Sequence, residues 1–140
     1  MNGFPAFPED TWQALAAYLQ PVDCQAGTLL FTEGDAADSL YFLVGGKFAV
    51  QKKGELPGRM QTVALLSGGS VAGEGALAGI AARRASLFCL ESGPVLRLSL
   101  ADHARLADEN PRLCLTLLHF LLRISSLRLG CCSDRLAVLL

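Results

Sequence analysis

One carboxylate, Glu74, and two neighbouring arginines, Arg83 and Arg84, lie in a stretch of otherwise small and apolar side chains over residues 71–88. An arginine guanidinium is a planar, permanently charged donor whose geometry matches phosphate and carboxylate oxygens. A carboxylate repels a phosphate, but it is a good acceptor for the hydroxyl of a sugar. These residue types therefore predict a site for an anion that also carries hydroxyl groups.

The main chain of the same stretch supplies further donors. A short helical turn is expected over residues 75–82, so the backbone N–H groups of Gly75 and Ala76 lie at its start. Unpaired N–H groups and the helix dipole favour an anion at that end. Gly73 and Gly75 carry no side chain, so the main chain can approach a ligand closely. After the arginines, Ala85 begins a segment whose side chains alternate as in a strand.

The same residue types also fit an ordinary ion pair between Glu74 and an arginine that closes a loop. Isolated Gly-Glu and Arg-Arg pairs are common, so the residue types alone do not separate the two interpretations. The order and the spacing of the residues distinguish them, because a longer pattern surrounds the charges.

That pattern resembles the phosphate-binding cassette of the cyclic nucleotide-binding domain family. Its members carry an apolar residue, Gly-Glu, a variable, a small and an aliphatic residue, a spacer, and then Arg-small-Ala before an alternating strand. The matching residues are Ala72, Gly73, Glu74, Gly75, Ala76, Leu77, Arg83, Arg84, Ala85, Ser86, Leu87, Phe88 and Cys89. A second family signature is matched by Gly34-Asp35, Leu40-Tyr41-Phe42-Leu43 and Gly46. With the flanking helices, the resemblance covers nearly the whole chain.

The resemblance implies roles for these residues. Arg83 would neutralise the cyclic phosphate, Glu74 would accept from the ribose 2′-hydroxyl, and the amides of Gly75 and Ala76 would complete the cradle. Family spacing in kinase regulatory subunits favours Arg83 as the phosphate ligand, whereas the spacing in bacterial activators favours Arg84. The choice between the two arginines stays open.

The chain also departs from the family pattern. Arg84 stands where members carry a small residue, and Ala72 and Gly75 replace larger apolar residues, which loosens the packing of the cassette. In the last helix, Ser125 and Ser126 resemble a Thr-Ser pair that reaches the purine in bacterial members. Adenine is the favoured base, with guanine as the second candidate.

Sequence patterns indicate one domain, 1–140, in three parts: residues 1–22, 23–99 and 100–140, with the cassette at 72–86. The first part is expected to be an amphipathic helix. The middle part has short apolar or alternating runs separated by turn residues every roughly 8 to 12 positions, which is typical of a sandwich or barrel. A mainly β fold follows, and the resemblance makes it a cyclic nucleotide-binding-like β-roll, a jelly roll with one N-terminal and two C-terminal helices.

Two helices are expected after residue 99, with Ser99 and Asn110 as their N-caps. In the second helix, apolar residues step by 4 and 3 along one seam, as in a coiled coil. The seam consists of Leu113, Leu117, Phe120, Ile124, Leu127 and Cys131. Two interpretations fit: a helix buried in its own core, or a helix that covers its own roll as a lid and pairs with a second copy. The second predicts a homodimer.

Composition excludes several classes of protein. The net charge of -1 gives no basic surface for nucleic acid, and the chain ends too early, by the family layout, for a DNA-binding domain of its own. The apolar run at 113–122 is about half of the roughly 20 residues that a spanning helix needs, so no membrane segment is expected. The five cysteines lack zinc-ligand spacing and no secretory leader precedes them, which predicts a reducing cytoplasm and no metal site.

These observations predict a cytoplasmic regulatory sensor that binds a cyclic purine nucleotide, preferably cyclic AMP and otherwise cyclic GMP, and signals through its C-terminal helix. We expect no enzymatic activity, because no matched acid, base or nucleophile accompanies Glu74. The alternative is a degenerate homodimerisation scaffold of the same fold that has lost ligand binding. A redox or haem sensor would need more than Cys24 near the first helix.

Overall fold

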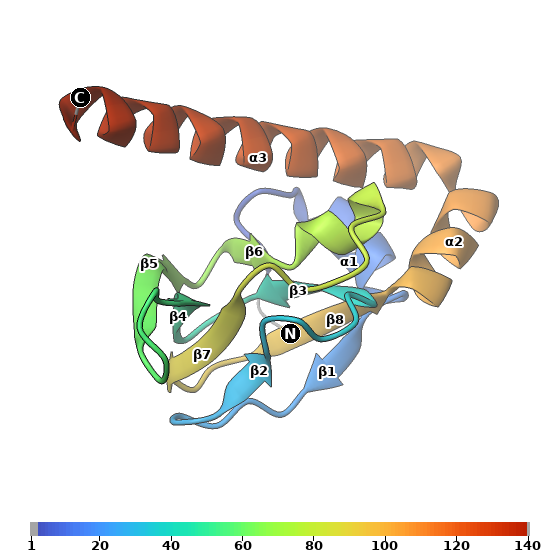
Figure 1. Cartoon of the computed structure of the whole chain (residues 1–140). Helices are drawn as coiled ribbons and strands as arrows, with labels where there is room; N and C mark the ends of the chain where they lie inside the picture. The colour runs from blue at the N-terminus through green and yellow to red at the C-terminus, as the bar shows by residue number, and fades with distance from the viewer. Residues whose placement is uncertain (1–2, 140) are drawn as a thin grey trace.

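The computed structural model describes residues 3–139, with side chains through residue 134, as two antiparallel sheets flanked by helices (Figure 1). The helices are α1 (Glu9–Ala16), the 3₁₀ turn η1 (Glu74–Ala78), α2 (Leu100–Glu109) and α3 (Pro111–Leu139). The strands are β1 (Gln20–Val22), β2 (Leu29–Phe31), β3 (Ser39–Leu43), β4 (Lys47–Lys53), β5 (Met60–Ser67), β6 (Ser70–Ala72), β7 (Ser86–Glu91) and β8 (Val95–Ser99). The predicted mainly β roll with helices at both ends is confirmed.

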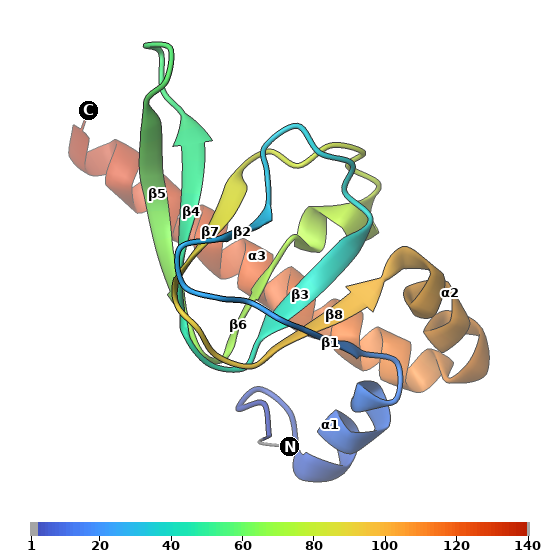
Figure 2. The same cartoon turned by 90° about the horizontal axis from the view of Figure 1, so that it is seen from below.

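The two sheets have the strand orders β1-β8-β3-β6 and β2-β7-β4-β5, and they curl around a shared interior (Figure 2). Every residue of β3 is buried, so this strand contacts apolar side chains on both of its faces. One apolar cluster fills the roll and includes Tyr41, Leu43, Phe48 and Leu87. The other cluster lies between the first sheet and the helices. The run of apolar residues in β3 therefore reflects its place between two cores.

The N-terminal segment holds the start of α3 in place. The ring of Phe4 lies 5.4 Å from that of Phe42 on β3, and the ring of Phe7 lies 4.9 Å from that of Phe120 on α3. Aromatic contacts of this kind add to the burial of the rings themselves. Residues 1–22 contain more than a helix, because α1 ends at Ala16 and Pro21 lies within β1.

Side-chain caps begin the two C-terminal helices, as the sequence predicts. The Ser99 hydroxyl accepts a hydrogen bond from the backbone N–H of Asp102 at 3.0 Å. The side-chain oxygen of Asn110 accepts from the N–H of Leu113 at 3.2 Å. These bonds satisfy donors that the first turn of a helix leaves unpaired.

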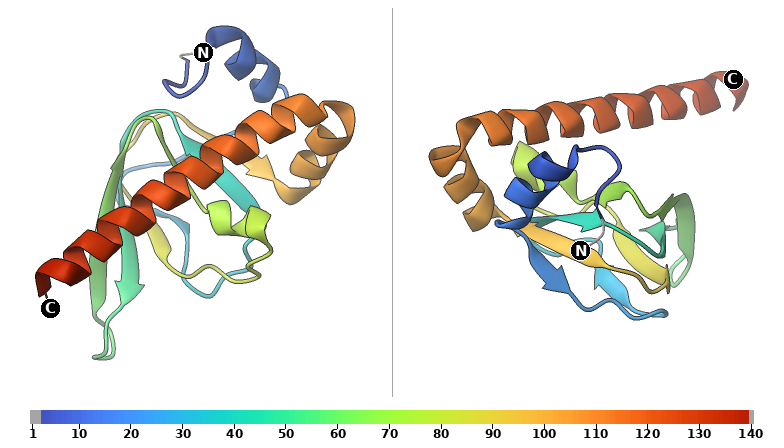
Figure 3. Two further views of the ribbon diagram at one scale, coloured as in Figure 1. Left: turned by 90° about the horizontal axis from the view of Figure 1, so that it is seen from above. Right: turned by 180° about the vertical axis from the view of Figure 1, so that it is seen from behind.

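Helix α3 lies across one end of the roll, from α2 to beyond β5 (Figure 3). Leu113 and Leu117, at the start of the predicted seam, are buried in the domain's own core, and Phe120 and Ile124 pack against it. The expected pairing through this seam is therefore wrong for its first four residues, whereas its last two, Leu127 and Cys131, are exposed. The early turns of α3 face aromatic side chains of the same chain, and these take up that face of the helix.

A second apolar stripe runs along the outside of α3. It consists of Leu115, Leu118, Leu122 and Leu129, all exposed. Their positions are separated by 3, 4 and 7 residues, so they lie along one line on the helix surface. This stripe, rather than the predicted seam, is the face of α3 that is open to a partner.

By length and composition, Pro111–Asp134 of α3 is apolar enough to cross a membrane, with a mean hydropathy of 1.4. A helix that packs against a protein core meets the same criterion. Leu113, Leu117 and Leu121 are buried against the domain, which accounts for part of this apolar character.

Candidate functional site

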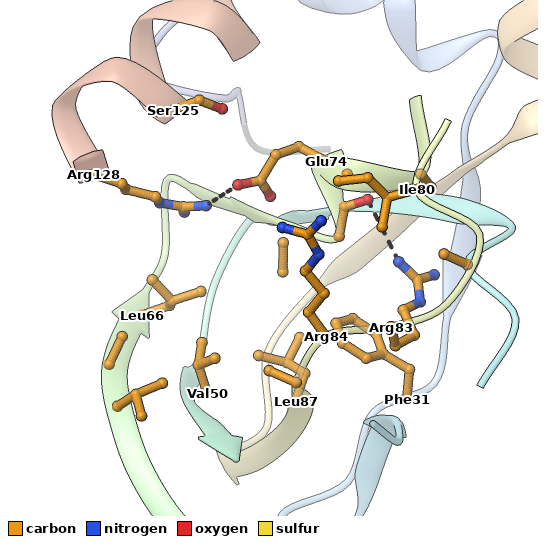
Figure 4. Close-up of a pocket in the computed structure, with 18 of the residues that line it drawn as sticks. Phe31, Val50, Leu66, Glu74, Ile80, Arg83, Arg84, Leu87, Ser125 and Arg128 are labelled. Carbon is orange, nitrogen blue, oxygen red and sulfur yellow. Dashed lines mark hydrogen bonds and ion pairs between the residues drawn. The ribbon is translucent and has the colours of Figure 1, made fainter. Parts of the chain in front are cut away.

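A cavity of about 740 Å³ opens between the cassette, the β2-β7-β4-β5 sheet and the second half of α3 (Figure 4). Its apolar wall includes Phe31, Val50, Val63, Leu66, Leu87 and Leu127. Its charged residues are Glu74, Arg83, Arg84 and Arg128. An apolar cavity with a few convergent charged groups is the usual form of a small-molecule site.

The structure brings most of the predicted site residues together around this cavity. Those that line it are Gly73, Glu74, Gly75, Ala76, Arg83, Arg84, Ala85 and Ser125. Ser126 is exposed and does not line the cavity. The two serines are adjacent on a helix, so their side chains point in directions about 100° apart.

The backbone of Arg83 is fixed by the loop that carries the other predicted signature. The N–H of Arg83 donates to the backbone oxygen of Asp35 at 2.8 Å, and the backbone oxygen of Arg83 accepts from Gly34 at 2.9 Å. Gly34 has a φ of 92°, a conformation that glycine adopts without strain. The two signatures therefore meet in space, although they are far apart in the sequence.

The Arg83 guanidinium is held by several contacts at once. Its Nη2 donates to the backbone oxygen of Ser39 at 2.8 Å and to the Ser39 hydroxyl at 3.2 Å. Its Nη1 donates to the backbone oxygen of Gly73 at 3.4 Å, and Asp38 lies 3.7 Å from Nη2. The ring of Phe31 stacks on the guanidinium, with its centroid at 4.2 Å from the central carbon. Three of the four N–H groups on the terminal nitrogens thus donate to the protein.

The Nε of Arg83 differs from the terminal nitrogens. It is buried and has no hydrogen-bond partner among the residues that the structure describes. The side chain is 4% exposed, and this burial lowers the pKa of Arg83 from its ordinary value. A buried donor without an acceptor is costly, so Nε is a candidate donor to a bound group.

Gly73 makes room for this arginine. It has a φ of 80°, and a Cβ built on it would lie 2.5 Å from Nη1 of Arg83 and 3.1 Å from the backbone oxygen of Ser39. Only glycine fits this position without displacing the guanidinium. The N–H of Ala76 donates to the backbone oxygen of Gly73 at 3.2 Å, so the turn η1 itself uses one of the amides that the sequence assigned to an anion.

Comparison with known proteins agrees with this geometry. The sequence profile of the family described as "Cyclic nucleotide-binding domain" matches residues 21–110. The chain belongs to the cyclic nucleotide-binding domain family. A comparison with curated protein sequences gives no match.

Solved structures of the family share the fold over most of this chain. A cyclic nucleotide-binding domain from Methylobacillus flagellatus is 27% identical with a TM-score of 0.80, over 92% of this chain and 72% of that one. The N-terminal domain of a transcriptional regulator from Streptomyces coelicolor is 27% identical with a TM-score of 0.73, over 94% and 90%. The catabolite activator protein of Thermus thermophilus is 28% identical with a TM-score of 0.70, over 93% and 62%.

In this member of the cyclic nucleotide-binding domain family, an arginine that the sequence interpretation missed completes the site. Nη1 of Arg128 on α3 lies 2.7 Å from a carboxylate oxygen of Glu74, and its Nη2 donates to the backbone oxygen of Val71 at 2.6 Å. Arg128 follows Ser125 by one helical turn, and that spacing was the available sign that both face the cavity. The predicted ion pair of Glu74 exists, but its partner is neither Arg83 nor Arg84.

Proposed function

We propose that this chain is a cytoplasmic regulatory sensor that binds a cyclic purine nucleotide, with cyclic AMP as the favoured ligand and cyclic GMP as the second candidate. The observation that carries the proposal is Arg83, a residue in the wall of the cavity whose buried Nε has no acceptor among the described residues. A phosphate oxygen is a strong acceptor for a guanidinium N–H. The proposal assigns binding, and no turnover, to this site.

The remaining contacts follow from the charges and positions around Arg83. The Glu74 carboxylate has a second oxygen beyond the one that meets Arg128, and this oxygen can accept from a ribose hydroxyl. Gly75, without a side chain, lets a phosphate approach the main chain of η1. The apolar wall around Val50 and Leu66, with Ser125 above it, suits the flat face and the polar edge of a purine.

Helix α3 is the element through which binding is signalled in this proposal. Ser125 and Arg128 place its second half over the cavity, while Leu113 and Leu117 fix its first half in the core. A nucleotide that contacts both the cassette and the second half of α3 favours the position in which the helix covers the cavity. Differential affinity for two helix positions is what makes such a contact a switch.

We also propose that the protein is a homodimer through the outer stripe of α3, formed by Leu115, Leu118, Leu122 and Leu129. Exposed leucines that repeat with this spacing along a helix are typical of a helix that pairs with another. Ser126, which points away from the cavity, lies beside this stripe. The five thiols are free, which supports a reducing cytoplasm as the compartment.

Isothermal titration with cyclic AMP and cyclic GMP tests the proposal. We expect saturable binding by the wild type, and a loss of affinity for E74Q, which keeps the shape of the side chain but removes its charge. R83K, which keeps the charge but removes the guanidinium and its Nε, should also lose affinity. Thermal melting checks that each variant is folded. A folded dimer that binds neither nucleotide would instead support the scaffold.

A further inference from the structure

The arginines of the cavity differ in whether an acidic side chain lies beside them. Arg128 forms an ion pair with Glu74 at 2.7 Å, and Arg83 lies 3.7 Å from Asp38. Arg84 lines the same cavity, is exposed, and has no ion pair or hydrogen bond to any side chain that the structure describes. Arg84 is therefore the cation whose charge no acid in the cavity offsets.

Arg83 alone is a limited ligand for a phosphate. Three of its five N–H groups already donate to oxygens of Ser39 and Gly73, so Nε and one N–H of Nη1 remain for an incoming acceptor. A cyclic phosphate has two exocyclic oxygens, each with lone pairs that need donors when water is removed. Two buried N–H groups leave some of these lone pairs without donors. The phosphate therefore needs a further donor from the same side of the cavity.

Arg84 is placed to supply it. It follows Arg83 directly in the chain, and Figure 4 shows its guanidinium inside the cavity, between Leu87 and Glu74. Resting on the proposed function, we propose that Arg84 is a second phosphate-binding residue: Arg83 gives buried, directional hydrogen bonds, and Arg84 gives the uncompensated charge and the further donors. The site then uses both arginines, where the sequence patterns left a choice between them.

The test compares nucleotide affinity of the wild type, R84Q and R84K by isothermal titration at about 0.05 M and about 0.5 M salt. R84Q should lose roughly 10- to 100-fold in affinity, the size expected for charge-assisted hydrogen bonds. R84K should keep more of the affinity, because it keeps the charge. The wild-type affinity should fall with salt more steeply than that of R84Q. R112Q, an exposed arginine at the start of α3 and outside the cavity, is the matched control and should behave as wild type.

Phosphorothioate analogues identify the oxygen concerned. The Rp and Sp forms each carry sulfur in place of one exocyclic oxygen. The form whose sulfur replaces the oxygen bound by Arg84 should bind the wild type more weakly than the other form does. This difference in affinity should disappear in R84Q. Thermal melting confirms that R84Q is folded, which is expected for an exposed, unpaired side chain. If the wild type binds and R84Q binds equally well with the same salt dependence, Arg84 has no such role. If the wild type binds neither nucleotide, the proposed function itself fails.

Discussion

Arg128 on α3 and Glu74 on the cassette form an ion pair at 2.7 Å, which joins two residues that lie 54 positions apart in the chain. Arg128 also donates to the backbone oxygen of Val71 at 2.6 Å, so one side chain ties the last helix to the strand that leads into the cassette. The carboxylate proposed to hold the ribose is therefore in direct contact with the helix proposed to carry the signal.

Replacing Arg128 should loosen the second half of α3. R128Q removes a charge-assisted pair between half-buried groups, and we expect a loss of about 1 kcal/mol in the free energy of unfolding. Hydrogen exchange of the amides around Ser125 should become faster, because the contact that holds this part of the helix is lost. Thermal melting and exchange followed by mass spectrometry measure both effects.

R123Q is the matched control for R128Q. Arg123 lies on the same helix, is exposed, and forms no ion pair within the described part of the chain. Its replacement should leave the melting temperature and the exchange rates unchanged. Equal effects of the two substitutions would show that the pair with Glu74 contributes nothing to the position of α3.

G73A should destabilise the cassette through the contact with Arg83. Its Cβ would lie 2.5 Å from Nη1 of Arg83, in a backbone conformation that side chains rarely adopt. We expect a cost of roughly 1–3 kcal/mol, measured by urea unfolding. G79A is the control, since Gly79 has a similar φ of 83° with nothing within 4 Å of its Cβ. The difference in the free energy of unfolding between G73A and G79A isolates the cost of the clash. A difference near zero would mean that the Arg83 guanidinium moves aside without cost.

L122E should convert a dimer into a monomer. It places a charge in the outer stripe of α3, where burial of an unpaired carboxylate is unfavourable, and light scattering measures the molar mass. L90E, the same change at an exposed leucine of β7, should keep the dimer. A wild type that stays monomeric at high concentration would exclude this role for the stripe.

Cysteine cross-linking gives a second view of the same interface. Ser126 is exposed and lies beside the outer stripe, whereas Cys131 and Cys132 are exposed and line the cavity. In a parallel pair of α3 helices, mild oxidation with a disulfide reagent should join two copies of S126C, made in a chain that also carries C131S and C132S. Non-reducing electrophoresis should show this dimer for S126C and should not show it for S125C in the same background, because Ser125 lines the cavity. The reverse pattern would place the interface on another face.

Stability should decrease on mild acidification through His103. Burial lowers the pKa of His103 from its ordinary value of 6.5, and its Nε2 lies 3.6 Å from the Cys114 sulfur. The folded state disfavours the charged form, so the unfolded chain binds more protons and stability falls as pH drops through 6.5, until the folded-state pKa is passed. Thermal melting from pH 8 to 5 should show a flatter profile for H103Q. H119Q, at an exposed histidine of α3, should keep the wild-type profile.

Local patterns were sufficient to predict the elements and the cassette. Ser99 and Asn110 cap the helices that they were expected to cap, because capping depends only on neighbours in the chain. The spacing of Glu74 from Arg83 identified the cavity, because the segment between them folds back as one short turn. The first four residues of the predicted seam pack within the domain instead, since a heptad pattern does not show which apolar surface a helix will cover.

The amino-acid sequence by itself therefore determined the roll, the flanking helices and the residues that gather around the cavity, because these follow from periodicity, caps and short-range spacing. The tertiary structure alone decided which partners those residues have. It pairs Arg83 with Ser39 and Asp38, pairs Glu74 with Arg128, and leaves Arg84 without an acidic partner among the residues that the structure describes. Such pairings depend on distances between segments far apart in the chain, and those distances are set only when the sheets and α3 pack together.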